Sequence, residues 1–408
     1  MPEAVIVATA RSPIGRAFKG SLKDVRPDDL ATMVVRAALD QVPQLDPHDI
    51  DDLMLGCGLP GGEQGMNMGR IVAMNLGYDF LPGTTITRYC SSSLQTTRMA
   101  LHAIRAGEGE VFISAGVETV SRFVKGNSDM IAGQQLTNPR YDQAQARTAQ
   151  LAEGGVDSWS DPRESGELPD AYIAMGQTAE NLARLKGITR QEMDEYATRS
   201  QNLAEKAIAD GFFEREITPI TLPDGTVVST DDGPRAGSTV EAMARLKPVF
   251  RPDGLITAGN ACPLNDGAAA VIVMSDTKAA ELGLTPLARI VSTAVTGLSP
   301  EIMGYGPVEA TRRALALAGK SVQDIDLFEI NEAFAAQVIP SYRDLNIALD
   351  TLNVHGGAIA LGHPFGSTGA RITGTLINGL RTLDKQFGVE TMCVGGGMGM
   401  AMVLERLS

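Results

Sequence analysis

Short apolar runs alternate with longer helical patterns along the whole of this 408-residue chain. Apolar runs of about four to eight residues are typical of buried strands, and apolar residues repeating every ~3.6 positions are typical of helices. The expected strands span residues 4–8, 53–56, 111–115, 268–274, 327–330 and 392–395, and the expected helices span residues 29–41, 94–107, 171–186, 189–211, 307–318 and 368–382. This alternation predicts an α/β fold.

Two distant stretches of the sequence resemble each other. Residues 36–53 read Arg-Ala-Ala-Leu, a connector and Asp-Ile-Asp-Asp-Leu, and residues 312–328 read Arg-Arg-Ala-Leu, a similar connector and Asp-Ile-Asp-Leu-Phe. Each stretch would take a helix into a strand near the start of one half of the chain. We therefore expect an internal duplication.

The middle of the chain differs in composition from its two ends. Residues from about 120 to 250 are rich in Gly, Pro, Asp and Gln, which is typical of a long insert that covers a binding site. The chain is also longer than a usual single domain. We expect an N-terminal half at 1–119, completed by 250–275, a loop (flap) domain at 120–249, and a C-terminal half at 276–408.

Charge and cysteine spacing exclude several classes of function. The formal net charge of −14 argues against a nucleic-acid partner, because phosphate binding requires a basic field. The N-terminus lacks the pattern of a signal peptide, and no stretch reaches the ~20 apolar residues of a membrane span. Cys57, Cys90, Cys262 and Cys393 form no CxxC pair, which argues against a zinc site or a disulfide framework. We expect a cytoplasmic protein with reduced thiols and no metal or membrane partner.

Cys90 lies where a loop gives way to the expected helix at 94–107, in Arg-Tyr-Cys-Ser-Ser-Ser-Leu. Backbone N–H groups and the helix dipole at such a position favour a thiolate, and we expect them to lower the pKa of Cys90. The same N–H groups can hold an oxyanion. The alternative is that Cys90 is a small buried apolar residue.

Three further motifs place polar side chains at strand ends or in glycine-rich loops. His363 stands in Gly-His-Pro, Cys393 opens Cys-Val-Gly-Gly-Gly, and Asn331 opens Asn-Glu-Ala-Phe. Taken singly, the first could be a turn with an incidental histidine and the last a helix cap. Because strand ends gather ligands in α/β folds, we expect the motifs to share one site.

Together these motifs resemble the thiolase family, and the resemblance spans essentially the full chain. The nucleophile motif is matched at Cys90, and the other family motifs at Asn331–Phe334, Gly362–Pro364 and Cys393–Gly397. Residues 257–268 resemble the coenzyme-binding segment of the family. The resemblance implies the thiolase fold, an α/β architecture of two similar halves in five αβαβα layers, with an inserted loop (flap) domain.

The resemblance also implies an acyltransferase. It would cleave a 3-ketoacyl-CoA to acetyl-CoA and a shortened acyl-CoA, or run the reverse Claisen condensation, through an acyl-Cys90 intermediate. His363 would take the proton of Cys90, and Cys393 would be the acid/base at the carbanion. A water on Asn331 together with His363 would form one oxyanion site, and the N–H groups of Cys90 and Gly395 the other. Coenzyme A would be substrate and product, with no prosthetic group.

For binding, the resemblance points to Arg235 at the adenine and phosphate end of coenzyme A and to Met175 in the acyl pocket. It also points to Phe334, and to Cys262, which replaces a serine that contacts the pantetheine arm in many thiolases. Ala174 stands where short-chain biosynthetic members carry histidine, which implies a different or roomier acyl pocket.

Two other readings remain open from the sequence. A ketoacyl synthase shares the fold but uses a cysteine with two histidines. A non-catalytic relative that binds CoA or lipid would be expected to have lost Cys90, His363 or Cys393, and all three are present. Family members associate through the N-terminal half, which implies a homodimer or homotetramer. The acyl chain and the direction, in fatty-acid β-oxidation or in biosynthesis, stay open.

Overall fold

The computed structural model describes residues 2–123, 137–155 and 158–408. Its strands are β1 Ala4–Arg11, β2 Gly15–Arg16, β3 Asp52–Cys57, β4 Gly83–Ile86, β5 Val111–Thr119, β6 Ile220–Thr221, β7 Val227–Val228, β8 Asn265–Ser275, β9 Ala288–Gly297, β10 Leu327–Ile330, β11 Phe387–Val394 and β12 Met398–Arg406. Its α-helices are α1 Pro27–Leu39, α2 Met68–Asn75, α3 Ser92–Ala106, α4 Asp142–Ala152, α5 Met175–Leu185, α6 Arg190–Ala209, α7 Val240–Ala244, α8 Asp276–Glu281, α9 Gly306–Ala318, α10 Ala335–Leu345, α11 Ala358–Leu361 and α12 Thr368–Thr382. Parts of the expected flap, residues 124–136 and 156–157, lie outside the described residues.

The same strand order occurs once in each half. The sheet runs β10-β11-β12-β9-β1-β8-β5-β3-β4, with β2 paired to β8. From the centre outward, the N-terminal half-sheet runs β1-β8-β5-β3-β4, and the C-terminal half-sheet runs β9-β12-β11-β10. In the C-terminal half, a parallel bridge from Phe328 to Leu352 takes the place of the β3–β4 pair. Pairing directions also match, since β1–β8 corresponds to β9–β12 and β3–β5 to β10–β11. The duplication expected from residues 36–53 and 312–328 therefore has a structural counterpart.

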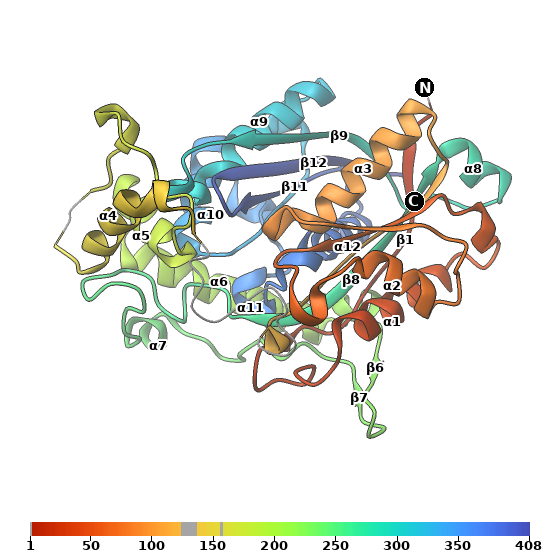
Figure 1. Ribbon diagram of the computed structural model, residues 1–408, viewed down its shortest axis with the longest axis horizontal. Coiled ribbons are helices and arrows are strands. Elements are labelled where there is room, and N and C mark those ends of the chain that lie inside the picture. The colour runs from red at the N-terminus through yellow and green to blue at the C-terminus, as the bar shows by residue number, and fades with distance from the viewer. Residues whose placement is uncertain (1, 124–136, 156–157) are drawn as a thin grey trace.

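Helices and sheets alternate in layers (Figure 1). Every residue of β8 is buried, and successive side chains of a strand point to opposite faces. Ala270 and Ile272 pack in one core with α1 and α2, whereas Val271 and Val273 pack in the next core with α3 and α12. Beyond the C-terminal half-sheet, Val389 packs in a third core with α9 and α10. The α/β fold class with a five-layer order is confirmed.

The two half-sheets are joined edge to edge. β1 pairs with β9 through Val5–Arg289 and Ile6–Ala288. The hydrogen bonding is therefore continuous from one half to the other.

Local signals explain several element boundaries. Helix α6 begins with a capping box between Thr189 and Glu192, as the expected start at 189 requires. Helix α5 begins at Met175 and not at 171, because Ala174 is extended at φ −66° and ψ 139°. The expected strand at 392–395 ends earlier, at the end of β11, and Gly396 and Gly397 follow with φ of 78° and 83°. None of the described helices is long and apolar enough to span a membrane.

Candidate active site

Cys90 and His363 occupy comparable places in the two halves. Cys90 lies in a single 3-10 turn, Tyr89–Ser91, that leads into α3. His363 lies just before another such turn, Phe365–Ser367, that leads into α12. Each candidate residue is therefore placed at the entry of a central helix.

These two helices begin side by side. The backbone N–H of Ala370 donates to Ser93 Oγ at 2.9 Å. A Cβ atom on Gly369 would lie 2.3 Å from the backbone nitrogen of Leu94, so only glycine permits this approach. The contact between the helix starts brings one residue from each half into a common site.

The imidazole of His363 is buried and held at both nitrogens. Its Nδ1 lies 2.6 Å from Thr368 Oγ1, and its Nε2 lies 3.3 Å from Asn331 Nδ2. The Thr368 hydroxyl also lies 2.8 Å from the carbonyl oxygen of Pro364. One tautomer satisfies all three contacts: Thr368 donates to Pro364, Nδ1–H donates to Thr368, and Nε2 accepts from Asn331. Burial, and the charge of Arg371, lower the pKa of His363 to about 3. His363 is thus a neutral base with its lone pair on Nε2.

Thr368→Val tests this assignment. Valine keeps the shape but leaves Nδ1–H without its acceptor. We expect kcat to fall about tenfold, a part of the ~10²–10⁴-fold that a positioned general base supplies, with KM little changed. Thr368→Ser should restore kcat. Thr382→Val is the matched control, because Thr382 makes the same bond to a carbonyl four residues back, at the far end of α12. An unchanged kcat in Thr368→Val would show that Thr368 does not set the tautomer.

The expected lowering of the Cys90 pKa is wrong for the free protein. Burial raises the pKa of Cys90 to about 12, and the carboxylate of Glu118 adds to the rise. Hydrogen bonds from the N–H groups of Gly395 and of Cys90 itself favour the thiolate but are outweighed by the loss of water. The thiol is therefore protonated at neutral pH and requires a base. The N–H of Gly395 is close enough to the sulfur to act on it.

The other thiols of the site are also buried. Cys393 is fully buried near the end of β11, and its pKa is raised by burial and by the adjacent thiols of Cys90 and Cys262. The backbone N–H of Cys262 donates to the carbonyl of Ala333 at 3.0 Å. All four cysteines of the chain are free thiols. The structure thus gathers three of them, from segments expected to share a site.

A cavity of about 280 Å³ opens beside Cys90. Its lining residues are Gly58, Leu59, Tyr89, Cys90, Ala171, Tyr172, Ile173, Met175, Phe365, Gly395 and Gly396. Met175, expected in the acyl pocket, and Gly395, expected in an oxyanion site, therefore line the same cavity as Cys90. Phe334 lies outside this lining and packs edge-on against Phe250, with ring centroids 6.3 Å apart.

Arg235 lies in a separate recess with Arg16, Gln201 and Pro263. Its backbone N–H donates to Gln201 Oε1 at 2.9 Å. Partial burial, and the nearby charge of Arg16, lower the pKa of Arg235. The guanidinium groups of Arg235 and Arg16 thus lie in the same recess as Pro263, which follows Cys262 in the chain. The arrangement suits a phosphate group.

Two supporting residues escaped the sequence analysis. Thr368 is only the first residue of the helix expected at 368–382, although a hydroxyl five residues after a candidate histidine was a usable signal. The side chain of Asn265 accepts the backbone N–H of His363 at 3.0 Å, and no sequence signal identified that role.

Glu332 is a third residue whose role only the structure reveals. Its buried carboxylate accepts from Tyr196 at 2.9 Å and from Ser200 at 2.6 Å, both on α6. It also accepts from Asn353 Nδ2 at 2.8 Å. The neighbour of Asn331 in the chain thereby ties the insert to the candidate site. Among the described residues, no group of three or more His, Cys, Asp or Glu side chains is placed to hold a metal ion.

Comparisons with known proteins agree across the full chain. The N-terminal domain of thiolase matches residues 4–277, and the C-terminal domain of thiolase matches residues 284–406. A 3-ketoacyl-CoA thiolase of Bacillus subtilis is 42% identical over 99% of this chain and 100% of its own length. An acetyl-CoA acetyltransferase of Pseudomonas aeruginosa is 43% identical, and a 3-oxoadipyl-CoA/3-oxo-5,6-dehydrosuberyl-CoA thiolase of Escherichia coli is 41% identical, each over 100% of both chains. The crystal structure of the Bacillus anthracis acetyl-CoA acetyltransferase has a TM-score of 0.86 and 42% identity, covering 100% of this chain and 99% of that one. The chain therefore belongs to the thiolase family.

Proposed function

We propose that the protein is an acetyl-CoA C-acyltransferase that cleaves 3-ketoacyl-CoA with coenzyme A, and that can run the reverse condensation, through an acyl-Cys90 intermediate. One observation carries this proposal. Cys90 and His363 lie at the adjacent entries of the two central helices, Cys90 lines the cavity, and the buried thiol of Cys393 lies close to that of Cys90.

The residues divide the steps of cleavage among them. His363 Nε2 takes the proton of Cys90, and the thiolate attacks the 3-keto carbon. The N–H groups of Cys90 and Gly395 hold the resulting oxyanion. The C2–C3 bond then breaks, and its electron pair leaves on the acetyl-CoA fragment, whose thioester oxygen is held by His363 and a water on Asn331. Cys393 protonates the carbanion.

The second half-reaction releases the acyl group. Cys393, left as a thiolate, takes the proton of a new coenzyme A, and the coenzyme A thiolate attacks the acyl-Cys90 thioester. Cys90 leaves as the thiolate and recovers its proton from His363. In the free protein the raised pKa of Cys393 keeps its thiol protonated, which is the form that the cleavage direction needs first. No step requires a metal or a prosthetic group.

Coenzyme A is proposed to run from Arg235 past Cys262 and Phe334 to Cys90. Arg235 and Arg16 would hold the adenine and phosphate end. Ala261, the neighbour of Cys262, forms an antiparallel bridge with Phe334, so these residues would flank the path of the pantetheine arm. Met175 would contact the acyl group.

Cys262→Ser tests the pantetheine contact. A thiol is a weaker hydrogen-bond partner than a hydroxyl, and a neutral hydrogen bond contributes roughly 0.5–1.5 kcal/mol. We therefore expect KM for coenzyme A to stay the same or to fall a few-fold. Measurement of KM together with Tm separates this role from simple packing. A lower Tm with unchanged KM would place the pantetheine contact elsewhere.

The domain division, the assembly and the compartment are part of the same proposal. Residues 1–119 with 250–275, and residues 276–408, would form the two chemical halves, and the flap at 120–249 would cover coenzyme A. A homodimer or homotetramer is the proposed assembly. The need for reduced Cys90 and Cys393 favours the cytoplasm, and β-oxidation of fatty acids would use the cleavage direction.

Thiolysis of acetoacetyl-CoA by coenzyme A tests the function directly. We expect consumption of both reactants, two acetyl-CoA per turnover, and ping-pong kinetics. The ketoacyl-synthase alternative requires a second histidine at the site. His355, the nearest in sequence, instead stacks on Phe212 with ring centroids 3.6 Å apart. Release of CO₂ from malonyl-CoA without thiolysis would favour that alternative.

A further inference from the structure

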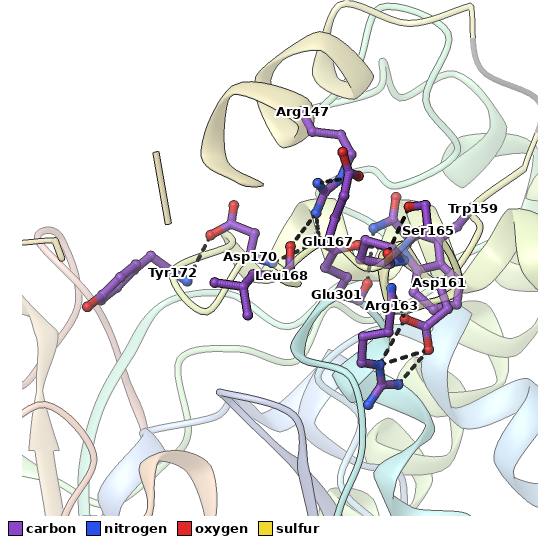
Figure 2. A network of polar contacts seen from close by, with 12 residues as sticks. Arg147, Trp159, Asp161, Arg163, Ser165, Glu167, Leu168, Asp170, Tyr172 and Glu301 are labelled. Carbon is purple, nitrogen blue, oxygen red and sulfur yellow. Dashed lines mark hydrogen bonds and ion pairs between the residues drawn. The ribbon is translucent and has the colours of Figure 1, made fainter. Parts of the chain in front are cut away.

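A buried carboxylate anchors the chain segment that enters the acyl cavity. Glu301 is 2% exposed and lies in the turn Pro300–Tyr305. Its Oε1 accepts from Arg147 at 3.0 Å and from the backbone N–H of Asp170 at 2.8 Å, and its Oε2 accepts from Trp159 Nε1 at 2.7 Å. Figure 2 shows these groups of the insert converging on the one carboxylate. Glu301 therefore holds a stretch of the insert against the C-terminal half.

The anchored stretch continues directly into the cavity lining. The side chain of Asp170, itself buried, accepts the backbone N–H of Tyr172 at 2.9 Å. Arg147 also donates to the carbonyl of Leu168 at 2.8 Å. Residues 171–175, here called the cavity wall, supply four of the lining residues beside Cys90. The position of the cavity wall thus depends on hydrogen bonds made by Leu168 and Asp170, just before it in the chain.

The chain just before Glu301, residues 298–300, contacts the glycine loop after Cys393. The backbone N–H of Leu298 donates to the carbonyl of Gly397 at 2.8 Å. A Cβ atom on Gly397 would lie 2.3 Å from the carbonyl oxygen of Leu298, so the two segments are in close contact. Gly395 and Gly396 also line the cavity. The segment 298–301 therefore contacts the glycine loop through its backbone and holds the insert through the carboxylate of Glu301.

The lining has a definite chemistry. None of the described residues that line the cavity is charged, and the larger side chains are those of Leu59, Ile173, Met175, Phe365 and two tyrosines. At about 30 Å³ for a group the size of a water molecule, a volume of about 280 Å³ exceeds what an acetyl group fills. A carboxylate at the end of an acyl chain would lose its water here without gaining a cation.

We propose that Glu301 is a positioning residue for substrate selection, which holds the cavity wall so that the cavity takes uncharged, apolar 3-ketoacyl chains longer than acetoacetyl. This inference rests on the proposed thiolase reaction. It adds the substrate class and the residue that maintains it.

The first test is a substrate comparison with the wild-type protein. We expect kcat/KM for 3-oxooctanoyl-CoA to exceed that for acetoacetyl-CoA about tenfold, since each methylene in an apolar pocket adds to transition-state binding. We expect it to exceed that for 3-oxoadipyl-CoA on the order of 10²-fold, because of the unpaired carboxylate. Equal efficiency with 3-oxooctanoyl-CoA and 3-oxoadipyl-CoA would overturn the proposal.

The second test separates positioning from general stability. In Glu301→Ala, the kcat/KM ratio of 3-oxooctanoyl-CoA to acetoacetyl-CoA should fall about tenfold, whereas Glu301→Gln, which keeps the volume and an acceptor oxygen, should lose less. Glu167→Gln is the matched control: Glu167 pairs with the same Arg147 at 3.1 Å, but its side chain is 55% exposed. That control should keep the wild-type ratio.

Trp159 gives a readout that does not depend on turnover, because it is the single tryptophan of the chain. Its fluorescence should shift to longer wavelength in Glu301→Ala and stay unchanged in Glu167→Gln. If Glu301→Ala does not fold, Glu301→Gln carries the test. Equal losses for both substrates, with unchanged Trp159 emission, would overturn the positioning role. Inactivity of the wild type with all three substrates, without an adduct on Cys90, would contradict the thiolase reaction itself.

Discussion

Cys90→Ser is expected to abolish covalent acylation and to lower kcat on the order of 10³-fold or more, as removal of a nucleophile typically does. The structure explains why the loss should be so large. Burial raises the pKa of Cys90 to about 12, so its reactivity depends on proton transfer to neutral His363. A serine hydroxyl holds its proton more strongly than a thiol, and the same base would remove it far less readily.

Intact-mass measurement after incubation with acetyl-CoA checks this result. The wild type should gain one acetyl group, and Cys90→Ser should gain none. Cys57→Ser is the control, because Cys57 is also a buried free thiol but lies in β3, with Glu118 as its neighbour. An adduct that persists in Cys90→Ser would identify another nucleophile.

Cys393→Ala is expected to keep acylation at Cys90 and to lose carbon–carbon chemistry by ~10²-fold or more, the usual effect of a missing general acid or base. Transfer of an acetyl group between acetyl-CoA and Cys90 creates no carbanion and does not need this proton. Cleavage of a 3-ketoacyl-CoA does create one. The raised pKa of Cys393 keeps the proton in place for that step.

Two assays on one preparation separate these reactions. Exchange of labelled coenzyme A into acetyl-CoA should continue in Cys393→Ala, and thiolysis of acetoacetyl-CoA should fall. Because exchange reports that the protein is folded and acylated, it serves as the internal control. Normal thiolysis in this variant would make Cys393 structural and would require another proton donor.

Much of the fold follows from local patterns. The alternation of apolar runs and helical periods predicted β10 and α12 at the residues that the structure shows, and it placed the core of β1, β3, β5 and β8. The repeated segments at 36–53 and 312–328 indicated the duplication. The start of α5 could not be predicted, because the turn at residues 171–172 is held by Asp170, whose backbone N–H is bonded to Glu301, 131 residues away.

The residues of the candidate site also fall into those that the sequence indicated and those that only the structure shows. Residue type and loop context made Cys90, His363, Cys393 and Asn331 candidates, and the resemblance to the thiolase family joined them into one expected site. The support given by Thr368 and Asn265 was not visible in the sequence. Each residue becomes a hydrogen-bond partner of His363 only when the chain is folded. In the sequence alone, many other polar residues are equally good candidates for that role.

The sequence by itself determined the order of strands and helices, the duplicated plan and the candidates for the reactive groups, because periodicity and residue chemistry act over a few neighbouring positions. Only the tertiary structure decided that α3 and α12 begin side by side, with Cys90 and His363 each just before the start of its helix. It also decided the direction of the Cys90 pKa. That pKa depends on how much water the whole fold removes from the thiol, and burial is a sum over contacts from both halves of the chain.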